Sequence, residues 1–388
     1  MLYTRRQMGR IALAAGVASQ LPAATKPDSR IKGVQIGAIT YSYRSMPDQS
    51  AEATLQYLID SGIGACELMS GPITNYMRKK GKWEGSAAAA AAVGGGARGG
   101  GFPGGGRGPA QAYPVVANMK AGFGNDQPAG QWNGVTCPAS PNAGGGRAAG
   151  PGGAPGGGRG AGGGRGARTP EQIAAADAER KWRLALPMDI FKDLRKMYND
   201  AGVSIYAIKD LPITTDEDLD FMLQVAATLG ANHFTTELPT GENAAVTLKR
   251  LGDAALKHKL FSAYHTHQQG SMTAFQAAFE ISKGNKANVD LGHFTAATNP
   301  GGTPLDFLNK FHDQIASFHL KDRTTVAHCA LNLPWGTGET PIAQILQTVS
   351  KNKWTMPGSI ELEYEIPAGS DAVQEVKKCV EFCRKSLA

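Results

Sequence analysis

The chain has 388 residues, of which 41% are hydrophobic, enough to bury the core of one large domain or of two smaller ones. Its 50 glycines are too many for an ordinary globular chain, and most of the excess lies within residues 71–170. The formal net charge is +7, but residues 1–30 and 71–170 carry more positive charge than this, so the rest of the chain is mildly acidic. An acidic folded body argues against a protein that tracks phosphate backbones, so no nucleic-acid partner is expected.

The first thirty residues have the layout of an export signal. Arg5, Arg6 and Arg10 precede the apolar run IALAAGVA, and a stretch of small residues follows at 21–25. The apolar run is too short to span a bilayer. The arginine pair resembles a twin-arginine signal, which exports proteins already folded, and a basic tail is the alternative. We therefore expect a periplasmic or secreted protein with no membrane anchor after signal removal.

Residues 31–70 begin a barrel, and residues 71–170 interrupt it. An alternating strand from Val34, a helix around Leu55 and a second strand containing Glu67 form one βαβ unit. The following hundred residues are mostly Gly, Ala, Pro and Arg in near-repeats such as GGGRG, which bury too little apolar surface to become ordered. We expect a disordered insertion that acts as a solvated spacer, with RNA or another anionic polymer as the alternative ligand of its arginines.

From residue 171 to the end, strands again alternate with helices. Predicted strands end at Lys209, Glu237 and His267, and further strands contain Asp290, His319 and Glu361. Helices are predicted over 169–199, 216–229, 244–257, 272–282, 303–308, 341–350 and 372–385. Counting from Val34 gives eight strands and eight helices, the number that closes a (β/α)8 TIM barrel, whose active sites lie at the carboxyl ends of the strands.

Ionisable residues close four consecutive predicted strands. Alternate residues of a strand share a face, so both histidines of 265–267 point the same way, as do both glutamates of 361–363. Two imidazoles and two carboxylates at one point suit Mn²⁺ or Zn²⁺ best, then Fe²⁺, Co²⁺ or Mg²⁺, and not Ca²⁺, which prefers oxygen ligands alone. The candidate ligands are His265, His267, Asp290, His319 and Glu361 or Glu363.

Other polar residues near these strand ends are candidates for proton transfer and substrate binding. Lys209 and Lys321 could supply positive charge to a developing oxyanion, or each could pair with the aspartate that follows it. The GTG run after Trp335 lacks the spacing of a phosphate loop and predicts a turn or lid whose indole stacks on a sugar. The candidate bases are Glu237, Glu363 and His267.

Five segments carry a resemblance to a known family. They are YHTH at 264–267, DLGHFTAA from Asp290, SFHLKDR ending at Arg323, PWGTGETPI from Pro334 and IELEYE from Ile360. Together they resemble the xylose isomerase-like TIM-barrel superfamily, in particular its sugar phosphate isomerase/epimerase group. The resemblance covers residues 34–70 and 169–388 and leaves the insertion unmatched.

The resemblance implies one metal ligand from each of strands five to eight. Carried onto this sequence, these are His265, Asp290, His319 and Glu361. The histidine on strand five departs from the glutamate common in the group, so Glu237 remains a substitute for the first ligand. His293, three residues after Asp290, and His267 would by resemblance contact substrate hydroxyls or move protons. We also assign Glu67, the acid of the second strand, to substrate binding.

These residue types suit proton transfer next to a carbonyl, with a metal stabilising an enediolate. The expected function is isomerisation or epimerisation of a free sugar or polyol. A lyase or dehydratase acting on a keto-sugar or glycoside shares the intermediate and is the first alternative, and a non-catalytic carbohydrate-binding barrel is the second. Apurinic-site endonucleases also use this barrel, but they need several metals and a basic groove. The five cysteines predict no disulfide framework, and the sequence leaves a homo-oligomer open.

Overall fold

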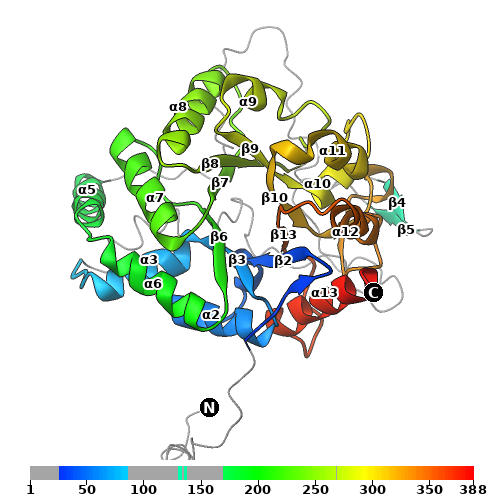
Figure 1. Cartoon of the computed structure of the whole chain (residues 1–388), viewed down its shortest axis with the longest axis horizontal. Coiled ribbons are helices and arrows are strands. Elements are labelled where there is room, and N and C mark those ends of the chain that lie inside the picture. The colour runs from blue at the N-terminus through cyan, green and yellow to red at the C-terminus, as the bar shows by residue number, and fades with distance from the viewer. Residues whose placement is uncertain (1–25, 86–129, 133–134, 138–168, 268) are drawn as a thin grey trace, which may run out of the picture.

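The computed structural model describes residues 26–85, 130–132, 135–137, 169–267 and 269–388. Their parallel strands close into a barrel in the order β2, β13, β10, β9, β8, β7, β6, β3, and β3 pairs back to β2. Figure 1 looks along this barrel and shows the helices as a ring outside it. The predicted (β/α)8 TIM barrel is therefore confirmed. The barrel strands are β2 (Val34–Ile39), β3 (Ala65–Met69), β6 (Ser204–Lys209), β7 (His233–Glu237), β8 (Phe261–His265), β9 (Asn285–Asp290), β10 (Ile315–Leu320) and β13 (Gly358–Ile360).

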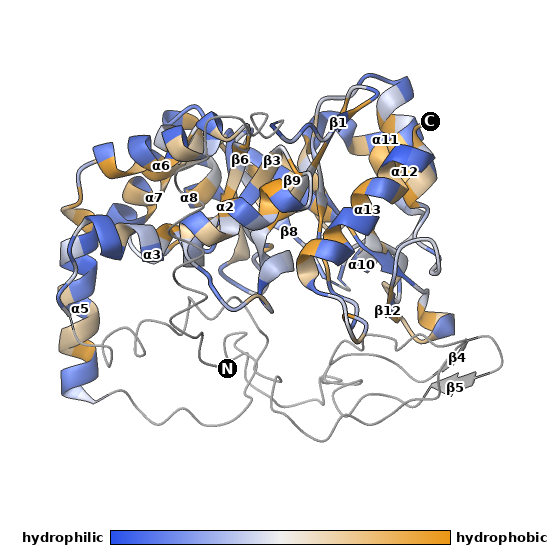
Figure 2. Cartoon of the chain, turned by 90° about the horizontal axis from the view of Figure 1, so that it is seen from below, coloured by the Kyte–Doolittle hydropathy of each residue, from blue (hydrophilic) through white to orange (hydrophobic). Residues whose placement is uncertain are grey.

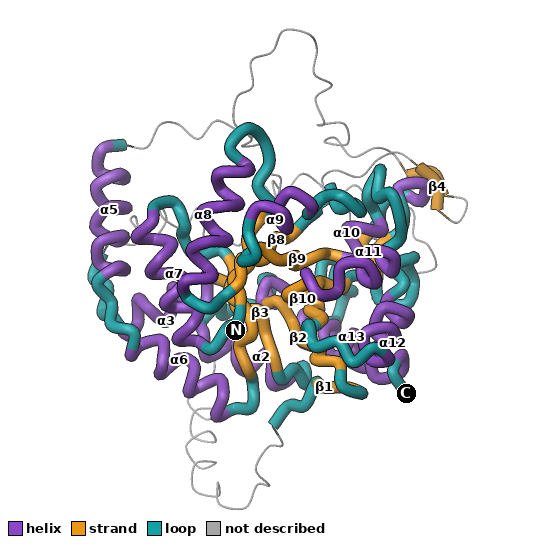
Figure 3. The backbone as a smooth tube through the Cα atoms, turned by 45° about the horizontal axis from the view of Figure 1, so that its top comes forward, coloured by secondary structure: helices purple, strands orange, loops and turns teal. Residues whose placement is uncertain are grey.

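The helices of the outer ring begin at recognisable sequence signals. Thr303 and Thr169 each start a helix with a capping box, and each is followed by a proline at the first helical position. Figure 3 shows these helices as a shell around the strands. They are α2 (Ala51–Asp60), α3 (Ser70–Lys80), α5 (Pro170–Leu184), α6 (Asp189–Asp200), α7 (Asp216–Leu229), α8 (Ala244–Lys257), α9 (Gln276–Ile281), α10 (Leu291–Thr295), α11 (Pro304–Phe311), α12 (Ile342–Lys351) and α13 (Ala372–Ser386).

The barrel strands separate an apolar outer layer from a polar interior. In β10, Phe318 and Leu320 pack in the apolar core, whereas Ser317 and His319 reach the interior and hydrogen-bond to side chains of other strands. Because alternate residues of a strand share a face, Lys321 continues the inward-facing series beyond the strand end. In Figure 2, helices such as α12 and α13 carry both hydrophobic and hydrophilic stretches, as amphipathic helices on a core do.

Two strands end earlier than the sequence predicts. β8 ends at His265, so His267 lies in the turn that follows, and β13 ends at Ile360, so Glu361 and Glu363 follow the strand. Strand alternation therefore does not by itself orient these pairs. At the barrel rim, a strand ends where its neighbours no longer offer backbone hydrogen bonds. The sequence does not show this position, so strand ends are predicted less accurately than strands themselves.

The predicted helices differ from the structure in three places. Residues 169–199 form α5 and α6 rather than one helix, because Pro187 lies in the break and cannot continue a helix. α9 begins at Gln276, later than predicted. α3 occupies residues assigned to the disordered insertion, because Ile73, Tyr76 and Met77 share one helical face and are buried against the barrel.

Part of the insertion is described. β4 (Gly130–Trp132) and β5 (Val135–Cys137) pair as a short antiparallel ladder, and β4 lies beside the 3₁₀ turn η3 (Val326–His328). The rest of the predicted insertion and the predicted export signal up to residue 25 lie outside the described residues. Among the described residues, no helix is long and apolar enough to cross a bilayer.

The cysteines differ from the prediction of no framework. Cys329, directly after η3, is disulfide-bonded. Cys66, Cys379 and Cys383 are free and buried, as expected for packing residues. No cysteine lies near Cys329 in the sequence, so the sequence did not predict its disulfide bond. Disulfide pairing depends on how close two cysteines lie in space.

Candidate functional site

His319 lies at the centre of a buried cluster of charged side chains. It projects from β10 into the barrel, where its Nε2 donates to Glu67 Oε2 and its Nδ1 to Glu361 Oε2, both at 2.8 Å. Burial alone would lower the pKa of His319, but the two carboxylates raise it to about 10. His319 is therefore an imidazolium in the metal-free protein.

Four donor atoms converge beside this imidazole. One atom each from His265, Asp290, His319 and Glu361 lies within 4.8 Å of the others, and all four residues are buried. A metal ion about 2.1 Å from each donor holds donors up to about 4.2 Å apart. His319 Nδ1 lies 3.9 Å from Asp290 Oδ2 and 2.8 Å from Glu361 Oε2, within that limit. The buried Oδ2 of Asp290 already faces a cation, since Lys321 Nζ lies 2.9 Å away. The donor set fits a divalent transition metal.

Glu67 orients His319 from across the barrel. It is fully buried on β3, and it also accepts hydrogen bonds from Thr235 Oγ1 at 2.5 Å and from Asn288 Nδ2 at 3.3 Å. Burial would raise the pKa of Glu67, but His319 lowers it to about 2. Glu67 accepts the hydrogen bond from the Nε2–H group of His319. Nδ1 is therefore the nitrogen of His319 that can lose its proton and bind a metal. The sequence assigned Glu67 to substrate binding, and in the structure its buried carboxylate contacts His319, Thr235 and Asn288.

Asn288 fixes the orientation of His265 by a similar chain of hydrogen bonds. Its Nδ2 donates to Glu67, so its Oδ1 must be the atom that accepts from His265 Nδ1, at 3.3 Å. With its proton on Nδ1, neutral His265 presents the lone pair of Nε2. Burial, followed by the charges of Lys209 and His319, holds the pKa of His265 well below its usual value. His265 is therefore a neutral imidazole suited to bind a cation.

Lys321 neutralises part of the cluster. Its Nζ lies 2.9 Å from Asp290 Oδ2, 2.8 Å from Glu361 Oε2 and 2.6 Å from Glu363 Oε2. Burial disfavours the charged form, but these carboxylates hold the pKa of Lys321 above its usual value. A divalent ion at the four donors must therefore share Asp290 and Glu361 with an ammonium group. This geometry shows Lys321 paired with the ligand carboxylates rather than with Asp322.

Four carboxylates face two cations in this buried cluster. The carboxylates belong to Glu67, Asp290, Glu361 and Glu363, and the cations are His319 and Lys321. The excess of negative charge in a buried site favours a bound cation. Charge balance thus agrees with the donor geometry.

A second, more exposed group lies at the end of β7. Glu237 accepts a hydrogen bond from Lys209 Nζ at 3.1 Å, and His267 Nδ1 lies 3.4 Å from the other carboxylate oxygen. About half of the Glu237 side chain is exposed, whereas Lys209 is buried. Lys209 ends β6 and the next residue, Asp210, has a left-handed backbone with φ of 66°. Such strain in a non-glycine residue is a feature that clusters at active sites.

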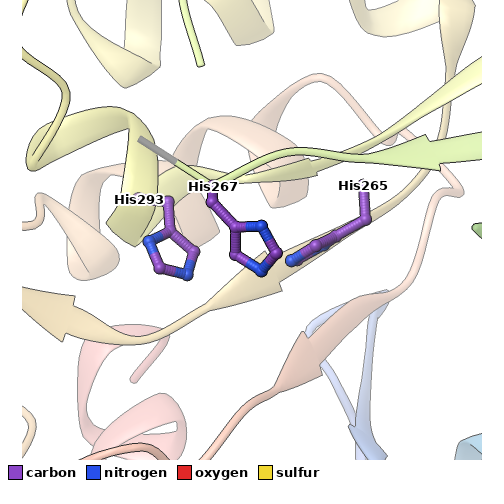
Figure 4. A group of neighbouring side chains, drawn as sticks. All are labelled: His265, His267 and His293. Atoms are coloured by element: carbon purple, nitrogen blue, oxygen red, sulfur yellow. The ribbon is translucent and has the colours of Figure 1, made fainter. Parts of the chain in front are cut away.

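Three imidazoles form a row between the two groups. Nitrogen atoms of His265, His267 and His293 also lie within 4.8 Å of one another, and Figure 4 shows His267 between the other two rings. His293 comes from α10 and is buried. Burial and the charges of Lys321 and Arg323 hold its pKa well below the usual value. The described residues thus contain two candidate metal sets that share His265.

Asp322 and Trp335 are built into a loop next to the cluster. Asp322 accepts backbone hydrogen bonds from Gly336, Gly338 and Thr340 at 2.8, 2.9 and 3.2 Å, so it anchors this loop. Trp335 meets Phe382 of α13 edge to face, with ring centroids 5.9 Å apart. The indole predicted to stack on a sugar thus packs against the outer helix, because α13 offers an apolar partner that the sequence does not reveal.

Arg323 was not among the candidate residues. It is among the largest fully buried side chains, and its Nη1 donates to His293 Nδ1 at 2.5 Å. The signal in the sequence was available, because His319, Lys321 and Arg323 alternate and so share a face. Thr235 and Asn288 had no such signal, since their roles depend on partners from other strands.

Solved structures of similar architecture exist. No family model and no curated protein matches the chain. A sugar phosphate isomerase/epimerase from Parabacteroides distasonis matches with a TM-score of 0.48 and 14% identity, over 93% of this chain and 97% of that one. The probable 3-DHS dehydratase AsbF of Bacillus anthracis matches with a TM-score of 0.49 and 12% identity, over 89% and 97%. The 3-keto-D-glucoside 4-epimerase YcjR of E. coli gives 0.41 and 11%, over 56% and 95%.

All three TM-scores are below 0.5 and all three identities are below 25%, so the likeness carries no argument about reaction or substrate. The chain is a (β/α)8 barrel with a charged, metal-suited cluster at the carboxyl ends of its strands. Barrels of this fold host many reactions, so the reaction depends on the residues of the cluster.

Proposed function

We propose that this protein is a metal-dependent isomerase or epimerase of a sugar that carries a carbonyl group, and that it works through an enediolate. The observation that carries the proposal is the convergence of His265, Asp290, His319 and Glu361, with donor atoms within 4.8 Å, in a buried cluster flanked by further carboxylates. These four residues would hold the ion, with Mn²⁺ or Zn²⁺ as the best fits to two imidazoles and two carboxylates. When bound, the ion supplies positive charge to neighbouring oxygens of the sugar.

Two carboxylates are placed to move a proton at carbon. Glu237 is the last residue of β7 and Glu363 follows β13, and the strands β8, β9 and β10 lie between them around the barrel. They therefore approach the cluster from different sides. An epimerisation needs a proton to leave one face of a carbon and another to arrive at the opposite face, so this placement favours epimerisation over a single-base isomerisation.

Each carboxylate has a lysine beside it. Lys209 lies 3.1 Å from Glu237, and Lys321 lies 2.6 Å from Glu363. A buried ammonium group stabilises negative charge that develops on a carbonyl oxygen when the carbon-bound proton leaves. We therefore propose that Lys209 and Lys321 bind substrate oxygens. We propose the same role for His267, which lies at the rim of the barrel.

We also propose that the protein works outside the cytoplasm. The arginine pair and apolar run at the N-terminus motivate this, and the disulfide bond of Cys329 supports it, since disulfides persist in oxidising compartments. Free sugars and glycosides, rather than sugar phosphates, would then be the substrates. Replacing Arg5 and Arg6 by lysine should leave the protein in the cytoplasm, and unchanged export would contradict the proposal.

The function is tested by metal analysis followed by a substrate screen. The full-length chain is loaded with Mn²⁺ or Zn²⁺, analysed for bound metal, and incubated with free sugars, polyols and 3-keto sugars in D₂O. We expect a product of unchanged skeleton that has gained deuterium from solvent. Glu363→Gln and Glu237→Gln are compared with Glu280→Gln, an exposed glutamate on α9.

The outcomes separate the alternatives. Loss of water or of an aglycone from the substrate would replace the isomerase by a lyase or dehydratase. A protein that retains no metal and turns over no sugar would be a binding barrel. Full activity in both the Glu237→Gln and Glu363→Gln variants would remove the two-carboxylate mechanism.

A further inference from the structure

We propose that Arg323 is a positioning residue that fixes His293 as a neutral Nε2–H donor, which makes His293 a ligand for a substrate oxygen and bars it from metal coordination. The contact that carries this is the hydrogen bond from Arg323 Nη1 to His293 Nδ1, at 2.5 Å. A guanidinium group has only donors, so Nδ1 must accept. The proton of the neutral ring therefore resides on Nε2.

Arg323 is held firmly enough to impose this tautomer. Its Nη2 donates to the carbonyl of Ala330 at 2.5 Å, and its backbone N–H donates to Thr340 Oγ1 at 3.0 Å. Ala330 follows the disulfide-bonded Cys329, and both residues have left-handed backbones. The loop thus directs a carbonyl at the guanidinium group, which in turn directs an N–H at His293.

His293 is fixed from the other side as well. Its backbone N–H donates to Asp290 Oδ1 at 2.7 Å, so the start of α10 is tied to the end of β9. Its Nε2 is buried and has no hydrogen-bond partner, and Glu363 Oε2 at 3.7 Å is too distant to accept. A buried donor without an acceptor costs free energy, which a substrate oxygen entering beside Glu363 would recover.

The tautomers decide between the two candidate metal sets. His265 and His319 can each offer a lone pair to an ion, on Nε2 and Nδ1 respectively, because their other nitrogens donate to Asn288 and Glu67. His293 offers none, since Arg323 occupies Nδ1 and the proton occupies Nε2. The row of imidazoles in Figure 4 is therefore not a three-histidine metal site, despite its close nitrogens. We expect one metal per chain.

The first test reads the tautomer directly. The full chain is labelled with ¹⁵N-histidine and loaded with diamagnetic Zn²⁺, and long-range ¹H–¹⁵N spectra are recorded, with His293 assigned from the His293→Gln variant. We expect a protonated Nε2 and a hydrogen-bonded, unprotonated Nδ1. Arg323→Met should convert His293 to a mixture of tautomers, and Arg323→Lys, which keeps a donor, should restore the native signal. A native His293 protonated on Nδ1, or shifted as a zinc-bound nitrogen, would overturn the proposal.

The second test does not depend on Arg323 variants folding. His293→Gln keeps an N–H near the Nε2 position, whereas His293→Ala does not. Both variants should bind one zinc per chain with native affinity, and loss of zinc from either would overturn the proposal. The use of the donor by a substrate rests on the proposed function. There, His293→Ala should lower kcat about 100- to 1,000-fold while His293→Gln retains most of it. Equal activity of the two would refute the donor role alone and leave the metal centre and the isomerase intact.

Discussion

The partners of each ring nitrogen determine what the histidines of this barrel can do. Glu67 accepts a hydrogen bond from Nε2 of His319, Asn288 accepts one from Nδ1 of His265, and Arg323 donates one to Nδ1 of His293. Three chemically identical side chains are therefore left with different nitrogens available: His265 and His319 for the proposed metal, and His293 for the proposed substrate contact. Metal binding in this barrel therefore depends on single ring nitrogens.

Replacing His319 tests the ligand set. We expect His319→Ala to lose its bound metal, because Nδ1 is removed and Glu361 and Asp290 keep only Lys321 beside them. The sequence alone suggested little loss of fold. The structure predicts destabilisation by roughly 3–5 kcal/mol, since the buried Glu67 loses its charged partner. Metal content and thermal unfolding measure the two effects.

His233→Ala is the matched control for that variant. His233 is also a buried barrel histidine, and its Nε2 bonds to Ser317 Oγ at 2.8 Å. It should lose stability but keep its metal. Full metal content in His319→Ala would show that the ion binds elsewhere.

The titration of His319 makes metal binding depend on pH. Its pKa is raised to about 10 in the metal-free fold, above the value near 6.5 of an unfolded chain. The proton therefore stabilises the metal-free fold fully below about pH 6.5, and this stabilisation is lost as pH rises through about 10. A metal must displace the Nδ1 proton, so affinity should rise with pH across this window. Calorimetry of Mn²⁺ binding at pH 7 in buffers of different ionisation enthalpy should show proton release, and its absence would contradict the assignment.

The loops after the strands position several side chains of the site that the strands themselves do not reach. β8 and β13 stop short of His267, Glu361 and Glu363, so these side chains are placed by turns. The loop that contains Gly336 and Gly338 folds over Asp322, which accepts its N–H groups. Elements thus bring the ligands together, and the loops orient the surrounding residues.

A glycine substitution tests that loop. A Cβ at Gly338 would lie 2.4 Å from Asp322 Oδ1, so we expect Gly338→Ala to destabilise the loop and shift the ¹⁵N signals of His293 through Arg323. Gly71→Ala is the control, since its Cβ meets nothing within 4 Å and the residue lies in α3. It should be neutral or stabilise by up to about 1 kcal/mol. Equal unfolding temperatures for the two variants would refute the role given to the loop.

At the scale of the whole molecule, the strands on either side of the insertion pair directly with each other. β3 pairs with β2 and with β6, although the insertion separates β3 from β6 in the sequence. The four residues of the metal-suited cluster lie on barrel strands or directly after them.

Deleting residues 86–110 tests whether the barrel and its site depend on the insertion. We expect the shortened protein to retain its metal, its unfolding temperature and nearly all of its activity, because the strand pairings lie outside the deletion. Metal content and thermal unfolding of the two chains provide the comparison. A collapse in turnover with unchanged metal content would instead show that the insertion covers the site.

The sequence by itself determined the alternation of strands and helices and the residue types at the strand ends. α7 and α8 have the predicted bounds, and Asp290 and His319 lie at the predicted positions on β9 and β10. These features follow from local periodicity, which the linear order of residues carries. They sufficed to predict the barrel and to nominate the four candidate ligands.

Only the tertiary structure decided which atoms of those residues are available. Glu67 reaches His319 across 252 positions of sequence, and Arg323 meets His293 across 30. Such contacts exist only once the barrel has closed, because closure brings the first strand pairs beside the last. Hydrogen-bond partners then fix protons and charges, and no local pattern in the sequence specifies which partner a buried nitrogen will find.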